Sequence, residues 1–171
     1  MTFTADKLIL FGATGDLSQR MLLPSLCALY ADGLVADDLQ IIGTARSAHD
    51  DDSFRAFAGV ALEKYLPEDR KAAIPALLAR LSYQTLDASK PEGFAALAEK
   101  AGTVDGGLAI FLSTAPSLFE PTIAGLAQAG LAGKKARIGL EKPLGTDLET
   151  SRLINDAVAG AFPEDRIFRI D

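Results

Sequence analysis

A glycine turn near the start of the chain has the residue types and the spacing of a nucleotide-binding site. The apolar run at 8–11 leads directly into Gly12 and Gly15, and an apolar helical pattern follows. Glycine lets the backbone bend sharply and leaves no Cβ between the turn and a pyrophosphate. The free N–H groups of the first helical turn also suit a phosphate. Thr14 stands where the middle glycine of G-x-G-x-x-G would be, so an ordinary strand–helix connection stays open.

An arginine follows the second expected strand, at a place where NAD sites commonly carry a carboxylate. That carboxylate accepts a hydrogen bond from the ribose 2′-hydroxyl. Here the strand at 39–44 continues into Arg46 and Ser47, and the next carboxylate is Asp50. A guanidinium matches a phosphate and would favour NADP by about 1.5–3 kcal/mol. A solvated arginine at a strand end is equally compatible with this spacing.

A lysine and a run of small residues follow two later strands. Ligands of open α/β sheets bind outside the carboxyl ends of the strands, so Lys142 can donate to a substrate hydroxyl, a phosphate or the nicotinamide region. Pro143 restricts Lys142 to an extended backbone, and a cis bond there would hold the ammonium group in a fixed direction. Ala115 and Pro116 would let a flat ring approach the backbone. The alternatives are a surface lysine in a turn and an ordinary helix start.

Strand-like and helical segments alternate along the whole chain and would position these residues. Most strand-like runs are continuously apolar, as expected when helices cover both faces of a parallel sheet. The pattern predicts one doubly wound, Rossmann-type α/β domain over residues 1–171, with three layers and right-handed crossovers. We expect strands at 7–11, 39–44, 82–86, 107–113, 136–141 and 166–170. We expect helices at 16–31, 53–65, 68–80, 91–100, 117–130 and 146–160.

Local signals mark several helix ends. Asp16 and Ser18 offer capping oxygens to the first helix, Pro24 predicts a kink or break in it, and Gly33 lies where it should end. Pro91 fits the first turn of the helix at 91–100. The polar stretch 49–53 is expected to cap the next helix rather than to bind a metal.

The bulk composition argues against several classes of partner. The 171 residues carry a net charge of −6, which disfavours nucleic acid or an anionic membrane as the main partner. The single cysteine, Cys27, lies in an apolar helical pattern and is expected in the core. The chain shows no signal sequence and no apolar run of membrane-spanning length, so we expect a cytoplasmic protein.

Four motifs in this order resemble the coenzyme-binding domain of glucose-6-phosphate dehydrogenases. They are GATGDLSQR at 12–20, GTARS at 43–47, EKPLG at 141–145 and RID at 169–171, and the resemblance spans essentially the whole chain. It implies NADP as coenzyme, with NAD also usable. It further implies hydride transfer from C1 of glucose 6-phosphate, which gives 6-phosphogluconolactone in the first step of the pentose phosphate pathway.

The resemblance also implies roles for individual residues. Asp171 would orient a histidine that acts as the general base, and Lys142 would lie near both the nicotinamide and the sugar. Thr14 and Arg46 would face the adenosine 2′-phosphate. No metal is expected. The expected coenzyme-binding residues are Gly12, Ala13, Thr14, Gly15, Asp16, Leu17, Arg46, Ser47, Ala115, Pro116 and Lys142.

The chain departs from the family pattern in two ways. Gln19 and Met21 stand where a basic residue and a lysine are often found, and the missing cation at position 21 is expected to weaken phosphate binding. The pattern also continues past Asp171 into a carboxy-terminal α+β domain with the general base, which the sole histidine, His49, cannot replace. We therefore expect this chain to be inactive alone. We expect the intact enzyme, with that domain, to bind glucose 6-phosphate and to form a homo-oligomer.

Two other functions remain as alternatives. Sugar oxidoreductases of the glucose–fructose oxidoreductase type also carry a Glu-Lys-Pro motif after the fifth strand, although their glycine turn usually has the G-x-G-x-x-G spacing. A non-catalytic module that senses NADP through a change of conformation is also compatible with a coenzyme domain on its own. A natural stop codon after Asp171 would favour this sensing module.

Overall fold

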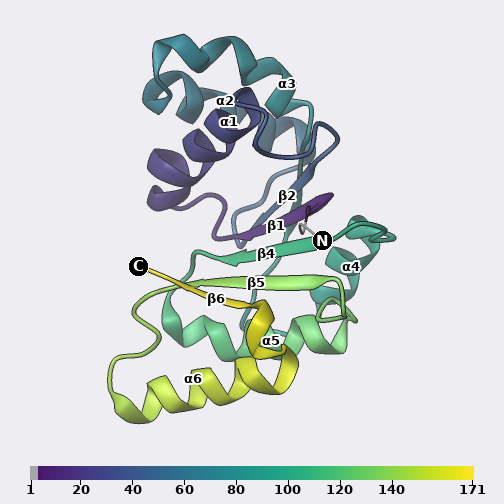
Figure 1. Cartoon of the computed structure of the whole chain (residues 1–171), viewed down its shortest axis with the longest axis vertical. Helices are drawn as coiled ribbons and strands as arrows, with labels where there is room; N and C mark the ends of the chain where they lie inside the picture. Colours follow the sequence, from purple (N-terminus) through teal and green to yellow (C-terminus); the bar gives the residue numbers. More distant parts are fainter. Residues whose placement is uncertain (1–3) are drawn as a thin grey trace.

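A parallel β-sheet runs through the centre of the molecule (Figure 1). The computed structural model describes residues 4–171, so the first three residues of the expected domain lie outside it, as does the part of the signal-sequence prediction that rests on them. The strands are β1 (Lys7–Phe11), β2 (Gln40–Ala45), β3 (Leu81–Thr85), β4 (Leu108–Leu112), β5 (Ala136–Glu141) and β6 (Ile167–Ile170). They lie in the order β3-β2-β1-β4-β5-β6 with every neighbouring pair parallel. This is a doubly wound order, and it confirms the predicted Rossmann-type α/β domain.

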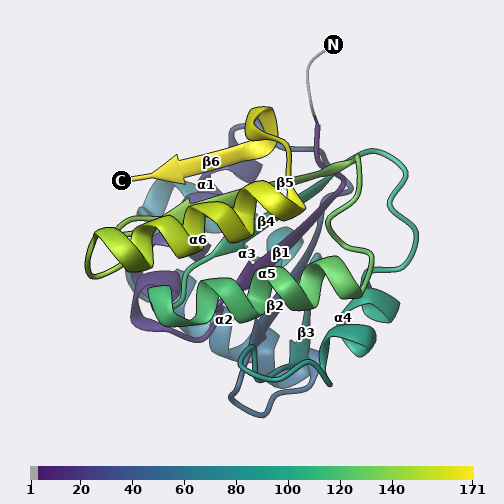
Figure 2. The same ribbon diagram turned by 90° about the horizontal axis from the view of Figure 1, so that it is seen from below.

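Helices cover both faces of this sheet and give the molecule three layers (Figure 1). One face carries α1 (Leu23–Ala31), α2 (Asp51–Tyr65) and the short α3 (Ile74–Leu78). The other face carries α4 (Phe94–Ala101), α5 (Phe119–Gln128) and α6 (Leu148–Ala161), which lie in front of the strands in Figure 2. Shorter helical turns lie at Ser18–Leu22, Glu68–Ala73, Pro116–Leu118 and Glu164–Arg166. Within residues 4–171 no helix is long and apolar enough to cross a bilayer.

The side chains of the inner strands alternate between two apolar clusters, one on each face of the sheet. In β1, Ile9 and Phe11 belong to the cluster beneath α4, α5 and α6, whereas Leu10 belongs to the cluster beneath α1, α2 and α3. A strand that is buried on both faces has to be apolar at successive positions, which is why the continuous apolar runs identified the strands. Cys27 is buried in the second cluster, as expected, and burial raises the pKa of its thiol.

The break expected at Pro24 takes the form of a wider helical turn. The Leu23 N–H donates to the Ser18 carbonyl, five residues back, so the turn at Ser18–Leu22 is of the π type. Pro24 then lies in the first turn of α1, where its missing N–H costs no hydrogen bond within that helix. The helical path therefore continues past the proline with one extra residue in the preceding turn.

The capping predictions were wrong at the start of the first helix and correct at its end and at the start of α2. Asp16 does not cap, because its carboxylate accepts from Arg20 Nε at 2.8 Å, and the Ser18 hydroxyl is buried without a partner among the described residues. Gly33 ends α1 with a φ of 69°, as expected. Asp50 caps α2 by accepting from the Ser53 N–H at 2.7 Å, which confirms the capping role of 49–53.

Proline and a local turn shorten two of the expected helices. The segment 68–80 divides into a 3-10 turn and α3, because Pro75 has no N–H with which to continue a helix. The helix expected to begin at Pro91 begins at Phe94 instead. A turn immediately before it, in which the Asp87 carboxylate accepts from the Ser89 N–H at 3.0 Å, delays its start.

Gly43 in β2 leaves no room for a side chain. A Cβ there would lie 2.6 Å from Phe54 Cζ and 2.9 Å from Ala13 Cβ, both in the buried core. We expect Gly43→Ala to lower the free energy of unfolding by about 1–3 kcal/mol, because the core has to shift. In the control Gly59→Ala on α2, the Cβ would meet only Leu78 Cδ1 at 3.4 Å, so we expect a gain of about 0.5–1 kcal/mol. Urea unfolding measures both, and equal stabilities would contradict this account of the core.

Candidate functional site

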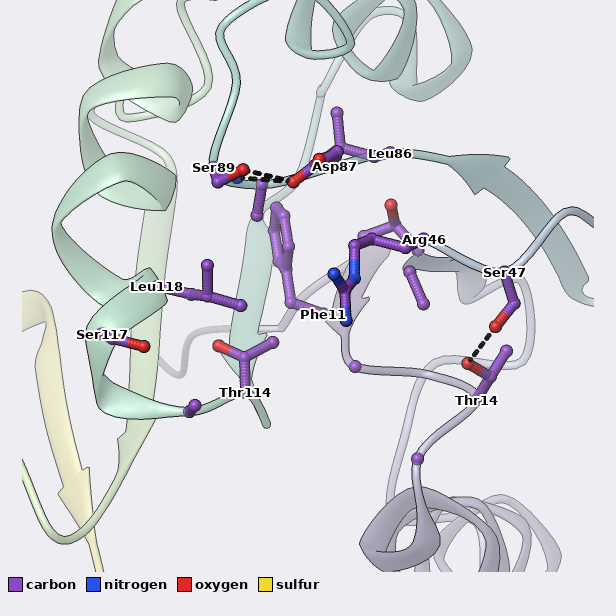
Figure 3. A pocket seen from close by; sticks show the side chains of 16 residues that line it. Phe11, Thr14, Arg46, Ser47, Leu86, Asp87, Ser89, Thr114, Ser117 and Leu118 are labelled. Atoms are coloured by element: carbon purple, nitrogen blue, oxygen red, sulfur yellow. Dashed lines mark hydrogen bonds between the residues drawn. The ribbon is translucent and has the colours of Figure 1, made fainter.

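A cleft of about 820 Å3 opens at the carboxyl ends of β1, β2, β3 and β4 (Figure 3). The chain crosses one face of the sheet from β1 to β2 and the other face from β3 to β4, so the strand order reverses beside β1. Ligands of doubly wound sheets bind at this position. The cleft is lined by Phe11, Gly12, Thr14, Gly15, Thr44, Ala45, Arg46, Ser47, Leu86, Asp87, Ala88, Ser89, Thr114, Ala115, Ser117 and Leu118.

The glycine turn forms the floor of the cleft between β2 and β4. The Gly12 N–H donates to the Thr44 carbonyl at 3.0 Å, which attaches the turn to the end of β2. Gly12 has a φ of 77°, and a Cβ there would overlap the carbonyl oxygen of Ser113 at the end of β4. Only glycine fits this position, because the backbone conformation and the neighbouring chain both exclude a side chain.

The helical path starts directly after the turn, where its N–H groups have no partners in the preceding turn. The Gln19 N–H donates to the Gly15 carbonyl at 3.1 Å, so Gly15 already belongs to the first helical turn. The Asp16 carboxylate lies at this end and would repel an anion, but Arg20 Nε contacts it at 2.8 Å and offsets the charge. The turn therefore presents backbone donors without an uncompensated negative charge.

The end of β2 brings an exposed cation to the wall of the cleft. Arg46 lies opposite Asp87, which follows β3 (Figure 3). The hydroxyl and the N–H of Ser89 donate to the Asp87 carboxylate and lower its pKa, and the charges of Lys90 and Arg46 act in the same direction. Ser47 Oγ lies 3.3 Å from Thr14 Oγ1, which joins the end of β2 to the glycine turn.

The expected coenzyme residues separate into those that line the cleft and those that do not. The lining residues are Gly12, Thr14, Gly15, Arg46, Ser47 and Ala115. Ala13 packs into the core beneath the turn. Pro116 instead lines a smaller cavity beside α6, and the cleft lining does not include Asp16, Leu17 or Lys142. A strand–helix turn curves away from the sheet, so successive residues of one motif face different surroundings.

The segment after β3 was missed by the sequence analysis. Leu86, Asp87, Ala88 and Ser89 line the cleft because β3 pairs in parallel with β2 and ends at the same edge of the sheet. The available signal was the position of this segment directly after an apolar strand. The rule that ligands bind at the carboxyl ends of parallel strands applies to β3 as well as to β1 and β2.

Lys142 and Asp171 meet at the ends of β5 and β6, outside the cleft lining. Lys142 Nζ lies 2.8 Å from Asp171 Oδ1, and the Lys142 N–H donates to the Ile170 carbonyl at 2.8 Å. The Lys142–Pro143 bond is cis. His49 lies on the connection between β2 and α2, where its Nδ1 is 3.0 Å from Ser53 Oγ. Among residues 4–171 no group of three or more acidic, histidine or cysteine side chains could hold a metal ion.

These features define a nucleotide-binding domain of the doubly wound class. Comparison with known proteins identifies the family. Residues 9–171 match the family described as "Glucose-6-phosphate dehydrogenase, NAD binding domain". The chain therefore belongs to the glucose-6-phosphate dehydrogenase family and forms its coenzyme-binding domain, which rules against the glucose–fructose oxidoreductase alternative.

Three similar proteins illustrate that this chain spans little more than a third of their length. The glucose-6-phosphate 1-dehydrogenase of Zymomonas mobilis is 56% identical over 173 aligned residues, which cover 100% of this chain and 36% of that protein. The crystal structure of the Mycobacterium avium enzyme is 34% identical with a TM-score of 0.84, covering 98% of this chain and 36% of that one. A glucose-6-phosphate dehydrogenase solved with its substrate glucose 6-phosphate is 30% identical with a TM-score of 0.84, covering 100% and 37%.

The contact between Lys142 and Asp171 should add little to stability. The side chains are 48% and 86% exposed, and exposed ion pairs contribute about 0–1 kcal/mol. We expect Asp171→Ala to change the free energy of unfolding by less than about 0.5 kcal/mol. Asp6→Ala is the contrasting variant, because the Asp6 carboxylate accepts from the Gly106 and Gly107 N–H groups. We expect Asp6→Ala to lower the free energy of unfolding by about 1–3 kcal/mol. Urea unfolding of both variants measures the difference, and a large loss at Asp171 would reveal a structural role.

Proposed function

We propose that this chain is the coenzyme-binding domain of an NADP-dependent glucose-6-phosphate 1-dehydrogenase and that its cleft holds NADP. The observation that carries the proposal is Arg46, an exposed guanidinium on the cleft wall at the end of β2. NAD-specific domains commonly have a carboxylate at this strand end, which a 2′-phosphate would meet with repulsion. A guanidinium offers a 2′-phosphate two parallel N–H donors and an opposite charge.

Each part of the cleft suits one part of the dinucleotide. Gly12 and Gly15 would let the pyrophosphate approach the turn without an intervening Cβ, and N–H groups of the helical turn that follows would donate to it. Thr14 and Ser47, whose hydroxyl oxygens lie 3.3 Å apart, would join Arg46 around the 2′-phosphate. The segment after β3 would accommodate the adenine. The connection after β4, which includes Ala115, would face the nicotinamide half.

Lys142 and Asp171, at the ends of β5 and β6, would face a sugar phosphate that reaches the coenzyme from that side. NADP would supply the hydride acceptor, and the protein would position the coenzyme and the substrate and set the charges around them. Lys142 would orient the substrate with its ammonium group, and Asp171 would hold a general-base histidine in one tautomer. Asp171 Oδ1 contacts Lys142 at 2.8 Å, which leaves Oδ2 as a second acceptor for an imidazole N–H.

The general base would come from residues outside this chain. The 171 residues contain one histidine, His49. It lies on the connection between β2 and α2, and its ring packs against the Tyr83 ring of β3. The chain spans 36% of the length of the Zymomonas mobilis relative, so a substrate domain would occupy the rest of a longer protein. Phe168 and Ile170 on β6 are 47% and 40% exposed and would pack against that domain.

We expect Arg46→Ala to weaken NADP binding by about tenfold or more, because a charge-assisted contact contributes about 1.5–3 kcal/mol. NAD has no 2′-phosphate, so its affinity should change little. Isothermal titration calorimetry of the 171-residue chain with each coenzyme measures both. Arg152→Ala on α6 is the control, because Arg152 lies away from the cleft and should alter neither affinity. Equal weakening of NAD and NADP would contradict the selecting role of Arg46.

We expect the purified 171-residue chain to produce no NADPH from glucose 6-phosphate and NADP. Its sole histidine does not line the cleft, and no other side chain of the chain takes the role of general base in this proposal. Absorbance at the NADPH wavelength, in the presence of a concentration of NADP that calorimetry shows to be saturating, measures the rate. Turnover that follows protein concentration and is lost in Arg46→Ala would show that the chain carries a complete active site.

A further inference from the structure

The segment that carries Arg46 lies just beyond the end of the strand pairing. The last paired residues of β2 and β3 are Ala45 and Thr85, and the Leu86 N–H donates to the Ala45 carbonyl at 2.9 Å. Arg46 and Ser47 follow as bends rather than as strand. The direction of the exposed guanidinium therefore depends on contacts other than the sheet.

Tyr83 of β3 supplies the shortest of these contacts. Its hydroxyl lies 2.7 Å from the Ser47 carbonyl oxygen and 3.1 Å from the Ala45 carbonyl oxygen. A phenol has one proton, so the closer Ser47 carbonyl is the main acceptor and Ala45 shares the donor. These two carbonyls belong to the residues on either side of Arg46. The other contact with the Ser47 carbonyl, from Thr85 Oγ1, is longer at 3.5 Å.

Tyr83 is itself held on three sides. Its side chain is 2% exposed, and its ring lies 4.8 Å from the Phe54 ring and 5.3 Å from the His49 ring, measured between centroids. Its N–H donates to the Asp51 carboxylate at 2.8 Å, and Lys100 contacts the same oxygen at 2.9 Å. Burial raises the pKa of the Tyr83 hydroxyl, so this group remains a proton donor at neutral pH.

We propose that Tyr83 is a positioning residue for coenzyme selectivity. Its hydroxyl holds the carbonyls on both sides of Arg46 and thereby directs Arg46 and Ser47 toward a 2′-phosphate in the cleft. The inference rests on the proposed NADP site and adds to it a residue that does not line the cleft. Tyr83 acts through the backbone of its neighbour and does not touch the coenzyme.

The effect should fall on the 2′-phosphate and leave the pyrophosphate unaffected. The glycine turn is attached to β2 by separate bonds, from the Gly12 and Ala13 N–H groups to the Thr44 carbonyl at 3.0 and 3.2 Å. Thr44 lies within the paired part of β2, opposite Gln84. Loss of the Tyr83 hydroxyl therefore releases the segment at 46–47 while the turn stays attached.

The test is Tyr83→Phe in the 171-residue chain, which removes the hydroxyl and keeps the buried ring. We expect NADP affinity to fall by about threefold to tenfold, the equivalent of one hydrogen bond, and NAD affinity to stay within about twofold. Calorimetry with the two coenzymes gives the ratio. Tyr30→Phe on α1, away from the cleft, is the control and should leave the ratio unchanged.

Several outcomes would overturn the inference while leaving the proposed function intact. In the first outcome, Arg46→Ala selectively lowers NADP affinity, but Tyr83→Phe leaves both affinities unchanged or lowers both equally. The hydroxyl would then have no role in selectivity. If the wild-type chain binds neither coenzyme, the proposed function itself fails. Amide hydrogen exchange then tests the attachment alone, because Tyr83→Phe should accelerate exchange at the Leu86 N–H, which donates to the Ala45 carbonyl that the hydroxyl also holds. Unchanged exchange there would show that the hydroxyl does not hold the segment.

Discussion

The close approach of β1 to the end of β4 is the constraint on which the site depends. Gly12 turns at a φ of 77° directly against the Ser113 carbonyl, and its N–H bonds to Thr44 on the other side. The turn is thus held between two strands that are far apart in sequence. Because it is held there, the helical N–H groups, the Arg46 segment and the connection after β4 all open onto one cleft. A single Cβ at Gly12 would force these parts to separate.

Much of the fold could be predicted from the sequence because burial on both faces leaves a strong local signal. The apolar runs around Ile9 and Ile110 show it, and every strand lies within one residue of its expected bounds. Helix ends were harder to predict, since over a few residues the same spacing of apolar side chains fits both a 3-10 turn and an α-helix. The break at Pro75 and the late start at Phe94 were therefore missed. Local chemistry, a missing N–H and a turn around Asp87, decides those ends.

The site was predictable mainly where a motif carried it. Gly12, Thr14 and Arg46 lie in recognisable motifs, and all three line the cleft. Asp87 was missed although its segment directly follows an apolar strand, because its position opposite Arg46 depends on the pairing of β3 with β2. The bond from Tyr83 to Ser47 joins residues 36 positions apart and depends on the same pairing. Such contacts require the paired strands before they can be seen.

The two edge strands of the sheet, β3 and β6, differ in their contacts and exposure. At the β3 edge, the Asp51 carboxylate occupies the outward N–H of Tyr83, and Lys100 adds a second charge. At the β6 edge, by contrast, Phe168 and Ile170 remain exposed on a short strand. An N–H that already donates to a side chain is not free to pair with an incoming strand, and charged side chains at a sheet edge discourage such pairing. An added strand at the β3 edge would therefore have to displace the Asp51 carboxylate from the Tyr83 N–H.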